Sequence, residues 1–169
     1  MRMDYLKKFY TIRRQEQSLS FTSLKKELYV KWIGTGKVIL DAGCSDGISD
    51  VPLMEHGNTV YGIDIVDKEV EKARSKGVRA LCMDLTEAPL PFEDNFFDVI
   101  IAGDIIEHVF DTDSLMREFY AKLKPGGHLI LTTPNLASFG RRMLLLFAGI
   151  LSANIPWRKR SKVLNRSDI

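Results

Sequence analysis

Acidic side chains follow apolar runs at four points in the chain, and each is a candidate ligand-binding group. They are Asp41, Asp64, Asp84 and Asp104. An ionised carboxylate accepts short, directional hydrogen bonds from a ligand that carries donors. If the four apolar runs are parallel strands of one sheet, these carboxylates gather at its carboxyl edge, where open α/β sheets bind ligands. The residue types and their positions therefore predict a ligand site built from strand ends.

The first of these acids leads into a glycine-bearing turn that ends at Gly47. The run from Val38 to Leu40 before it is typical of a strand buried on both faces, and the apolar residues after it recur at helical spacing. A strand, a tight turn and a helix in this order let a ligand approach the backbone and meet the amide groups at the helix start. A tight turn without a ligand is the alternative interpretation.

The spacing of acids and glycines narrows the class of ligand. Asp64 lies near the end of the predicted strand 59–65, 21 residues beyond Gly43. A carboxylate in this position can accept both hydroxyl hydrogens of a ribose, which indicates a ligand that contains adenosine. A solvated aspartate at a strand end is the alternative. Gly43 and Gly47 do not fit the G-x-G-x-x-G pattern, so a nicotinamide-dependent dehydrogenase is poorly supported.

Four segments, in order along the chain, resemble motifs of the class I S-adenosylmethionine-dependent methyltransferases. The turn is similar to the family's acidic-x-G-x-G-x-G motif, with Ser45 in place of the middle glycine. The other segments are L-P-F-E-D-N-F-F-D-V-I at 90–100, E-H-V at 107–109 and L-K-P-G-G-H-L-I-L at 123–131. Together the matches cover about residues 37–135. The resemblance implies an α/β fold with a doubly wound, Rossmann-like, mostly parallel sheet of strand order 3-2-1-4-5.

The same resemblance implies S-adenosyl-L-methionine as the cofactor and assigns residues to it. From the residues alone, Asp84 has an equally good interpretation as the cap of the turn that follows it. The implied cofactor-binding residues are Asp41, Gly43, Cys44, Ser45 and Gly47 for the amino-acid end, Asp64 and Ile65 for the ribose, Asp84 and Leu85 for the base, and Asp104 beside them.

Glu107 and His108 carry the candidate catalytic chemistry, because the family's similar segment lines the cavity where the methyl group is transferred. Transfer to an oxygen requires alignment of the acceptor and removal of its proton. His108 is the candidate base because imidazole titrates near neutral pH, and Glu107 would orient it. One alternative is a divalent cation bound by Asp104, Glu107 and His108. The other is that both residues only begin a helix and shape the pocket, and no metal site is assigned.

Length and composition set wider limits. The 169 residues fit one domain, and the net charge of +2 gives no specific argument for a nucleic-acid partner. Cys44 and Cys82 lack the spacing of a metal site or a redox pair, which favours a reducing, cytoplasmic location. Met1 is followed by charged residues without a long apolar region, so no signal peptide is predicted.

The segments that flank the predicted core 37–135 are expected to be helical. Within 1–36, amphipathic helices at about 1–17 and 23–33 would line the substrate mouth or merely cover the sheet. Within 136–169, a Leu-rich helix at 136–151 is too short to span a bilayer. Together with the basic residues up to 160, its region 141–160 would contact a membrane surface, guide an apolar substrate, or simply pack on the sheet.

The family's sheet usually ends in an antiparallel hairpin, but no alternating pattern follows Asn135. The last parallel strand is therefore predicted to expose its edge to a second copy or another partner. The predicted function is methyl transfer from S-adenosylmethionine to a small-molecule or lipid-like acceptor. The alternatives are a non-catalytic binding or regulatory module that keeps the fold, and a truncated fragment of a methyltransferase.

Overall fold

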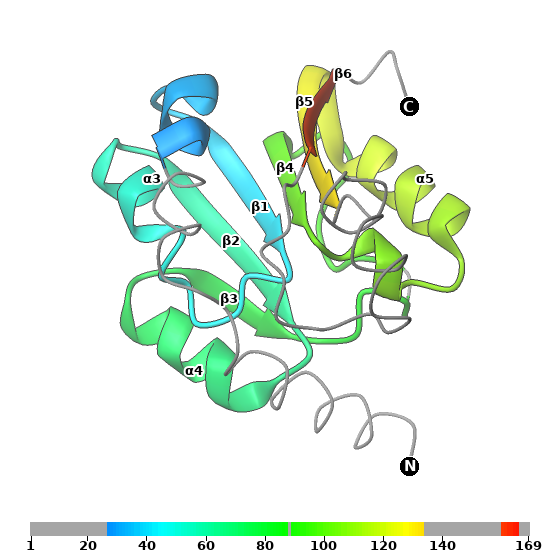
Figure 1. Cartoon of the computed structure of the whole chain (residues 1–169), viewed down its shortest axis with the longest axis horizontal. Helices are drawn as coiled ribbons and strands as arrows, with labels where there is room; N and C mark the ends of the chain where they lie inside the picture. Colours follow the sequence, from blue (N-terminus) through cyan, green and yellow to red (C-terminus); the bar gives the residue numbers. More distant parts are fainter. Residues whose placement is uncertain (1–26, 88, 134–159, 166–169) are drawn as a thin grey trace, which may run out of the picture.

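The computed structural model describes residues 27–87, 89–133 and 160–165 (Figure 1). A helix over residues 27–33 precedes the first strand. The elements that follow are β1 (Val38–Ala42), α3 (Val51–Glu55), β2 (Thr59–Asp64), α4 (Asp67–Ser75), β3 (Arg79–Cys82), β4 (Phe97–Gly103), the 3₁₀ helix η1 (Ile106–His108), α5 (Thr112–Lys122), β5 (Leu123–Thr133) and β6 (Arg160–Asn165).

The strands form one sheet in the order β3-β2-β1-β4-β5-β6. β1 pairs in parallel with β2 on one side and with β4 on the other, and β5 pairs in parallel with β4. The predicted order 3-2-1-4-5 and the doubly wound fold are confirmed. The winding direction reverses between β1 and β4, and sheets of this kind bind ligands at the carboxyl edge beside such a reversal.

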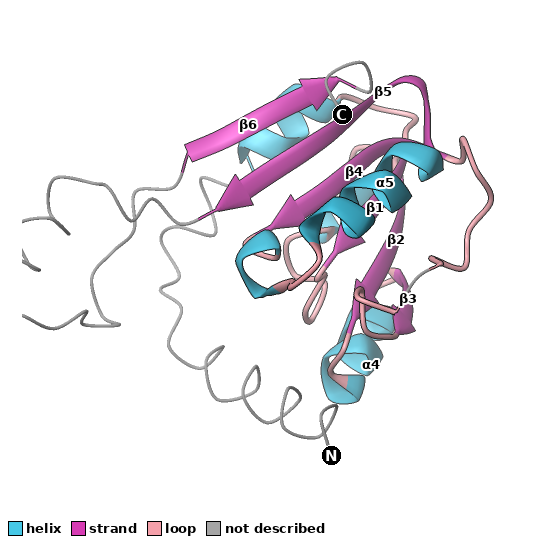
Figure 2. Cartoon of the chain, turned by 90° about the vertical axis from the view of Figure 1, so that its right-hand side faces the viewer, coloured by secondary structure: helices cyan, strands magenta, loops and turns pink. Residues whose placement is uncertain are grey.

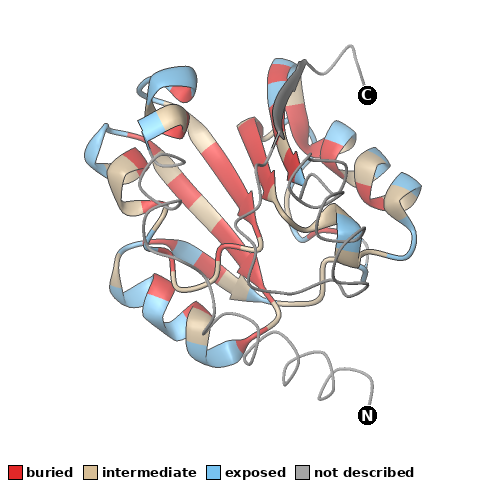
Figure 3. Ribbon diagram, viewed as in Figure 1, coloured by how far each residue is buried: buried red, intermediate tan, exposed pale blue. Residues whose placement is uncertain are grey.

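Helices cover both faces of the sheet, and each face has its own apolar core (Figures 2 and 3). One core joins Tyr29 and Ile33 of the first helix, and residues of α3 and α4, to the face that includes Ile39. The other core joins α5, through Leu115 and Phe119, to the opposite face. The central strand β1 is buried on both faces, as its continuous apolar run predicts.

Helix boundaries differ from the predicted ones where local chemistry intervenes. The helix expected after Gly47 begins only at Val51 and spans five residues, with Pro52 in its first turn. Proline suits a helix start because it lacks the amide hydrogen that the interior requires. α5 begins after Asp111, whose side chain accepts a hydrogen bond from the Ser114 amide at 3.0 Å.

The edge of β5 is covered, which corrects the prediction that it would be free. β6 pairs with it antiparallel, from His128 opposite Asn165 to Thr133 opposite Arg160. The polar segment 160–165 looked like a solvated tail because it lacks apolar alternation. An edge strand is held by main-chain hydrogen bonds, however, and charged side chains are common there. A free strand edge is therefore no longer an argument for a partner.

The amino ends of the strands are fastened by side chains that bridge to the backbone. The Asn58 side chain accepts from the Lys37 amide at 2.8 Å and donates to the carbonyls of Gly34 and Leu53 at 2.9 Å each. The Asp98 carboxylate accepts from the Val38 amide at 2.8 Å and from the Lys124 ammonium at 2.9 Å. These contacts join β1, β4 and β5 at the end of the sheet remote from the candidate site.

Several predicted segments lie outside the described residues: the helix at 1–17, the beginning of the helix at 23–33, and the Leu-rich helix at 136–151 with its basic neighbours. In the part of the chain that the structure describes, no helix has the length and apolar character needed to cross a bilayer. The proposed membrane contact of 141–160 and the cytoplasmic location remain predictions.

Candidate functional site

The four acids of the sequence analysis lie at the same edge of the sheet, as expected for parallel strands. Asp41 is the next-to-last residue of β1, and Asp64 is the last residue of β2. Asp84 and Asp104 come within two residues after the ends of β3 and β4. β1 pairs with β2 on one side and with β4 on the other, so the carboxyl ends of these parallel strands lie at one edge of the sheet (Figure 1). The four predicted acids therefore lie along the edge where sheets of this kind bind ligands.

The glycine turn after β1 has an unusual backbone. Gly43 and Gly47 adopt φ of +86° and +71°, and Ser45 between them adopts +54°. A left-handed conformation is disfavoured for a residue with a side chain, by about 1–2 kcal/mol. The amides of Gly43 and Cys44 both donate to the carbonyl of Ile63, at 2.7 and 3.0 Å. The turn is thus folded tightly against the end of β2.

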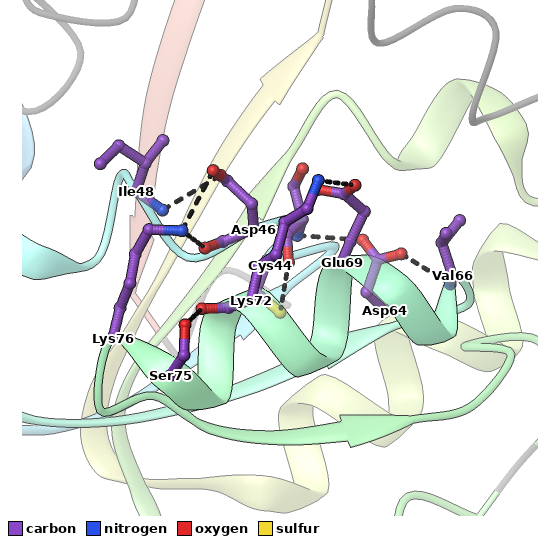
Figure 4. Close-up of polar contacts among 10 residues, drawn as sticks. Cys44, Asp46, Ile48, Asp64, Val66, Glu69, Lys72, Ser75 and Lys76 are labelled. Carbon is purple, nitrogen blue, oxygen red and sulfur yellow. Dashed lines mark hydrogen bonds and ion pairs between the residues drawn. The ribbon is translucent and has the colours of Figure 1, made fainter.

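Asp64 is held by this turn (Figure 4). Its carboxylate accepts from the Ser45 amide at 3.0 Å and from the Val66 amide at 2.9 Å. The residue is only 2% exposed. The structure therefore brings the predicted amino-acid and ribose parts of the site together, with Asp64 as the link. A carboxylate has about four acceptor positions, so one carboxylate can join several donors.

Two residues assigned to the cofactor are also required for packing. A Cβ atom on Gly47 would lie 3.0 Å from both Ala73 and Val78, so glycine lets α4 approach the turn. Cys44 is buried, and its sulfur would lie 2.6 Å from a Cβ on Gly62. Any contact of Cys44 with a ligand would therefore involve its backbone rather than its thiol.

Asp84 makes the local contacts of a turn cap. Its carboxylate accepts from the Thr86 amide at 2.9 Å and from the Thr86 hydroxyl at 2.7 Å. This is the geometry of the alternative interpretation, although a turn aspartate retains free acceptor positions. Leu85 beside it packs against the core on the α5 side of the sheet, and Ile65 after β2 is half-buried.

The segment after β4 folds back onto the site. Asp104 has a left-handed backbone, with φ of +60°. Its amide donates to the Thr132 carbonyl at 2.8 Å, and the Thr132 hydroxyl lies 3.5 Å from its carboxylate. The next residue, Ile105, lies so close to Gly43 that its side chain would overlap a Cβ atom there. The ends of β1, β4 and β5 are thereby tied together.

The candidate catalytic residues lie in η1, directly after this segment. His108 Nε2 is 4.0 Å from a carboxylate oxygen of Glu107. At this separation the two groups interact electrostatically, since a hydrogen bond would be shorter. Within the described ranges, no group of three potential metal ligands is close enough to hold an ion. The geometry therefore gives no support to a cation bound by Asp104, Glu107 and His108.

The sequence analysis did not identify Asp50, a buried acid that follows the glycine turn closely. Asp50 immediately precedes α3 and is 1% exposed, and neither carboxylate oxygen has a hydrogen-bond donor among the described residues. Burial, followed by the negative charge of Asp41, raises the pKa of Asp50 well above its usual range. The sequence offered only an acid two residues before a proline, which is the signature of an exposed helix cap.

Tyr29 is the second residue that the sequence did not indicate. It comes from the helix over 27–33 and is buried in the core on that face of the sheet. Burial and then the Asp41 charge raise the pKa of Tyr29, so its hydroxyl stays neutral and can donate. The helix over 27–33 thus brings a buried tyrosine close enough to Asp41 for the charge of that residue to affect it.

Comparison with known proteins places this arrangement in context. The model of the family described as "Methyltransferase domain" matches residues 40–131, more than half of the chain. A mitochondrial ubiquinone biosynthesis O-methyltransferase from Homo sapiens is 29% identical over 130 residues, which cover 72% of this chain. The match covers 35% of the human protein, so this chain corresponds to about a third of that relative's length.

Two solved structures extend the comparison. An S-adenosylmethionine-dependent methyltransferase from Mesorhizobium loti shares 30% identity with a TM-score of 0.56, over 60% of this chain and 48% of that one. A protein from Pyrococcus horikoshii OT3 shares 25% identity with a TM-score of 0.64, over 89% of this chain and 77% of that one. The second similarity therefore covers most of this chain.

Proposed function

This chain belongs to the class I S-adenosylmethionine-dependent methyltransferases, and we propose that it transfers a methyl group from S-adenosylmethionine to an oxygen atom of a small-molecule or lipid-like acceptor. The observation that carries the proposal is the convergence of Asp41, Asp64 and the glycine turn within the region that the family model matches. These are the residues to which the family's motif assigns the cofactor.

The described residues fit this cofactor chemically. Its amino-acid end carries an ammonium group, and the buried carboxyl groups of Asp41 and Asp50 offer acceptors, of which those of Asp50 have no donor among the described residues. Its ribose carries two hydroxyl donors, for which the Asp64 carboxylate offers acceptor oxygens. Since Asp64 is almost fully buried, neighbouring side chains must shift before a diol can reach it.

The cofactor supplies an activated methyl group, so the protein's task is to hold the acceptor in line and to manage its proton. In the proposed reaction His108 takes the proton from the acceptor oxygen, and Glu107 stabilises the imidazolium that results. The distance of 4.0 Å between the two side chains suits an electrostatic role for Glu107 better than a hydrogen bond.

Oxygen is proposed as the acceptor atom because the human relative is named as an O-methyltransferase of ubiquinone biosynthesis. That name also favours a lipid-like acceptor over a very polar one. The alternative of a non-catalytic module rested on an exposed β5 edge, and β6 occupies this edge. No observation in the described structure favours that alternative.

Calorimetric titration with S-adenosylhomocysteine tests the cofactor assignment. The Asp64→Asn variant keeps an acceptor for a backbone amide but loses the charge and part of its acceptor capacity. We expect affinity to fall at least tenfold, because a hydrogen bond to a charged group contributes about 1.5–3 kcal/mol. Asp113→Asn, the same change at an exposed acid of α5, serves as the control and should leave affinity unchanged.

A transfer assay with methyl-labelled S-adenosylmethionine and a panel of catechols and ring-hydroxylated lipids tests the reaction itself. Label in an O-methyl product, lost in the His108→Ala variant while S-adenosylhomocysteine still binds, is the expected result. If wild-type protein binds no cofactor, or if Asp64→Asn binds it as tightly as wild type does, the assignment of this site is wrong.

A further inference from the structure

The carboxyl-terminal end of α4 has a backbone motif that fixes the residues around it. The Gly77 amide donates to the Arg74 carbonyl at 3.0 Å. The Val78 amide donates to the Ala73 carbonyl at 3.1 Å. Gly77 adopts a φ of +99°, the left-handed conformation with which helices of this kind end. Lys76 is the C-cap residue inside this motif, so its backbone has one defined position.

The glycine turn after β1 packs on this end of α4. A Cβ atom on Gly47 would lie 3.0 Å from Ala73 and from Val78, so these two residues determine how closely the turn approaches the helix. Both are buried, with exposures of 0% and 2%. Such an apolar contact is not directional. It sets the position of Gly47 but leaves the orientation of the neighbouring peptide groups to other contacts.

The Lys76 side chain supplies a directional contact to the same turn (Figure 4). Its ammonium donates to the main-chain carbonyl of Asp46 at 2.7 Å and to one carboxylate oxygen of Asp46 at 3.2 Å. The other carboxylate oxygen accepts from the Ile48 amide at 3.2 Å. The carbonyl belongs to the peptide group between Asp46 and Gly47. Lys76 therefore fixes the orientation of that peptide group relative to α4.

The turn requires such support because its backbone is strained. Ser45, directly before Asp46, has a left-handed φ of +54°. A conformation of this kind persists only where the surrounding contacts hold it. The Ser45 amide donates to the Asp64 carboxylate at 3.0 Å. The strained segment is therefore held from two sides, by Asp64 at Ser45 and by Lys76 at Asp46.

We propose that Lys76 is a positioning residue for the cofactor, which holds the glycine turn in its binding conformation through Asp46 and does not touch the cofactor itself. The inference rests on the proposed function, since it takes the turn to bind the cofactor. Without the ammonium, the turn adopts the binding conformation for a smaller fraction of the time. The apparent affinity for the cofactor falls by that fraction.

Lys76→Met tests the proposal, because methionine keeps a long apolar stem and removes the charge. We expect the affinity for S-adenosylhomocysteine, measured by calorimetric titration, to fall about threefold to tenfold. The melting temperature should fall by less than about 3 °C, because a partly exposed ion pair contributes little to global stability. Lys76→Arg keeps a charged donor and should recover most of the affinity.

Lys72→Met is the matched control. Lys72 lies one turn earlier on α4, and its ammonium binds Glu69 of the same helix at 2.8 Å. The substitution removes the same charge from the same helix and leaves the contact between Lys76 and the turn in place. Its affinity for S-adenosylhomocysteine should equal that of wild type. An equal loss in both variants would mean that only the charge of α4 matters, and the proposal would be wrong.

Asp46→Asn distinguishes positioning from direct contact with the ligand. This variant keeps the main-chain carbonyl that Lys76 binds, so we expect a smaller loss of affinity than in Lys76→Met. The double variant should bind as Lys76→Met does, because the two side chains act through one contact. If Lys76 bound the ligand's carboxylate directly, its release from Asp46 would raise the affinity. Tighter binding by Asp46→Asn than by wild type would therefore contradict the proposal.

Amide hydrogen exchange reports on the turn itself. Peptides that cover 43–50 should exchange faster in free Lys76→Met than in free wild type, and equally slowly once both proteins are saturated with S-adenosylhomocysteine. Wild-type protein that binds the ligand, with unchanged affinity and exchange in Lys76→Met, would overturn this inference and leave the proposed function intact. Folded wild-type protein that binds no ligand would instead contradict the proposed function, and the inference with it.

Discussion

The two ends of the parallel strands treat their charged side chains in opposite ways. At the amino ends, Asp98 accepts from the Val38 amide and from Lys124, and Asn58 bonds three backbone groups. At the carboxyl edge, Asp41 and Asp50 are both buried, and the charge of Asp41 contributes to the raised pKa of Asp50. The contacts at the amino edge stabilise the charged form of Asp98, whereas at the carboxyl edge burial and the charge of Asp41 disfavour the ionised form of Asp50.

The pKa of an acid is lowered at the amino edge and raised at the carboxyl edge. Burial alone would raise the pKa of Asp98, but the bonds from Val38 and Lys124 outweigh it, and the pKa lies below its ordinary value. For Asp50 every influence raises the pKa. Backbone strain follows the same division in part, because Ser45 and Asp104 at the carboxyl edge adopt left-handed conformations. Backbone strain and perturbed pKa values in proteins are concentrated at functional sites.

The largest effect is expected at the amino edge, from Asn58→Ala. This buried side chain makes three hydrogen bonds to the backbone, and its loss leaves buried polar groups unpaired. We expect a loss of about 3 kcal/mol in the free energy of unfolding, measured by urea denaturation. Asn58→Asp keeps the acceptor for the Lys37 amide, but when ionised it can no longer donate to the Gly34 and Leu53 carbonyls, so it should lose less stability at low pH, where the protonated acid can donate, than at high pH. A cost below 0.5 kcal/mol would mean that this edge is not fastened as described.

A smaller effect, with a distinct pH dependence, is expected from Asp98→Asn. Because folding lowers the pKa of Asp98, its contribution to stability is present above about pH 4 and is lost as pH falls through the lowered value. The partly exposed ion pair with Lys124 is screened, so the variant should lose only about 1 kcal/mol at pH 7. Its stability curve should converge with that of wild type at low pH, and a constant gap would argue against the ion pair.

The smallest effect is expected in the turn, from Ser45→Gly. Glycine adopts the left-handed conformation without the side-chain penalty, although it gains more entropy in the unfolded chain. We expect a net gain of about 0.5 kcal/mol in stability and little change in cofactor affinity, since the Ser45 amide that binds Asp64 is retained. Destabilisation by Ser45→Gly would indicate that the hydroxyl group has a role of its own.

The order of the motifs was enough to predict the sheet and the edge at which its acids meet. Strand order follows from motif order, because the segments around Asp41, Asp64 and Asp104 alternate with helical patterns. The burial of Asp50 depends on how α3 packs in the folded protein, and the residues next to Asp50 in the sequence give no sign of that packing. The role of Asp84 stayed open for a similar reason, since the same carboxylate suits a turn cap and a ligand.

The pairing of β6 with β5 could not be predicted for a different reason. A central strand can be recognised by its run of apolar side chains, as in Val38 to Leu40. An edge strand can pair through its backbone hydrogen bonds alone, without such a run. Segment 160–165 is mostly polar, and 26 residues separate its start from the end of β5. Pairing over such a distance leaves no periodic signal in the sequence.

The central claim is that the carboxyl edge binds the cofactor while the amino edge only holds the sheet together. Amide hydrogen exchange of the 169-residue chain, with and without saturating S-adenosylhomocysteine, tests it most directly. We expect the ligand to slow exchange in peptides that cover 41–50, 64–66 and 104–106, and to leave peptides around 34–38 and 94–98 unchanged. Unchanged exchange at the carboxyl edge, or equal protection of both edges, would contradict the account.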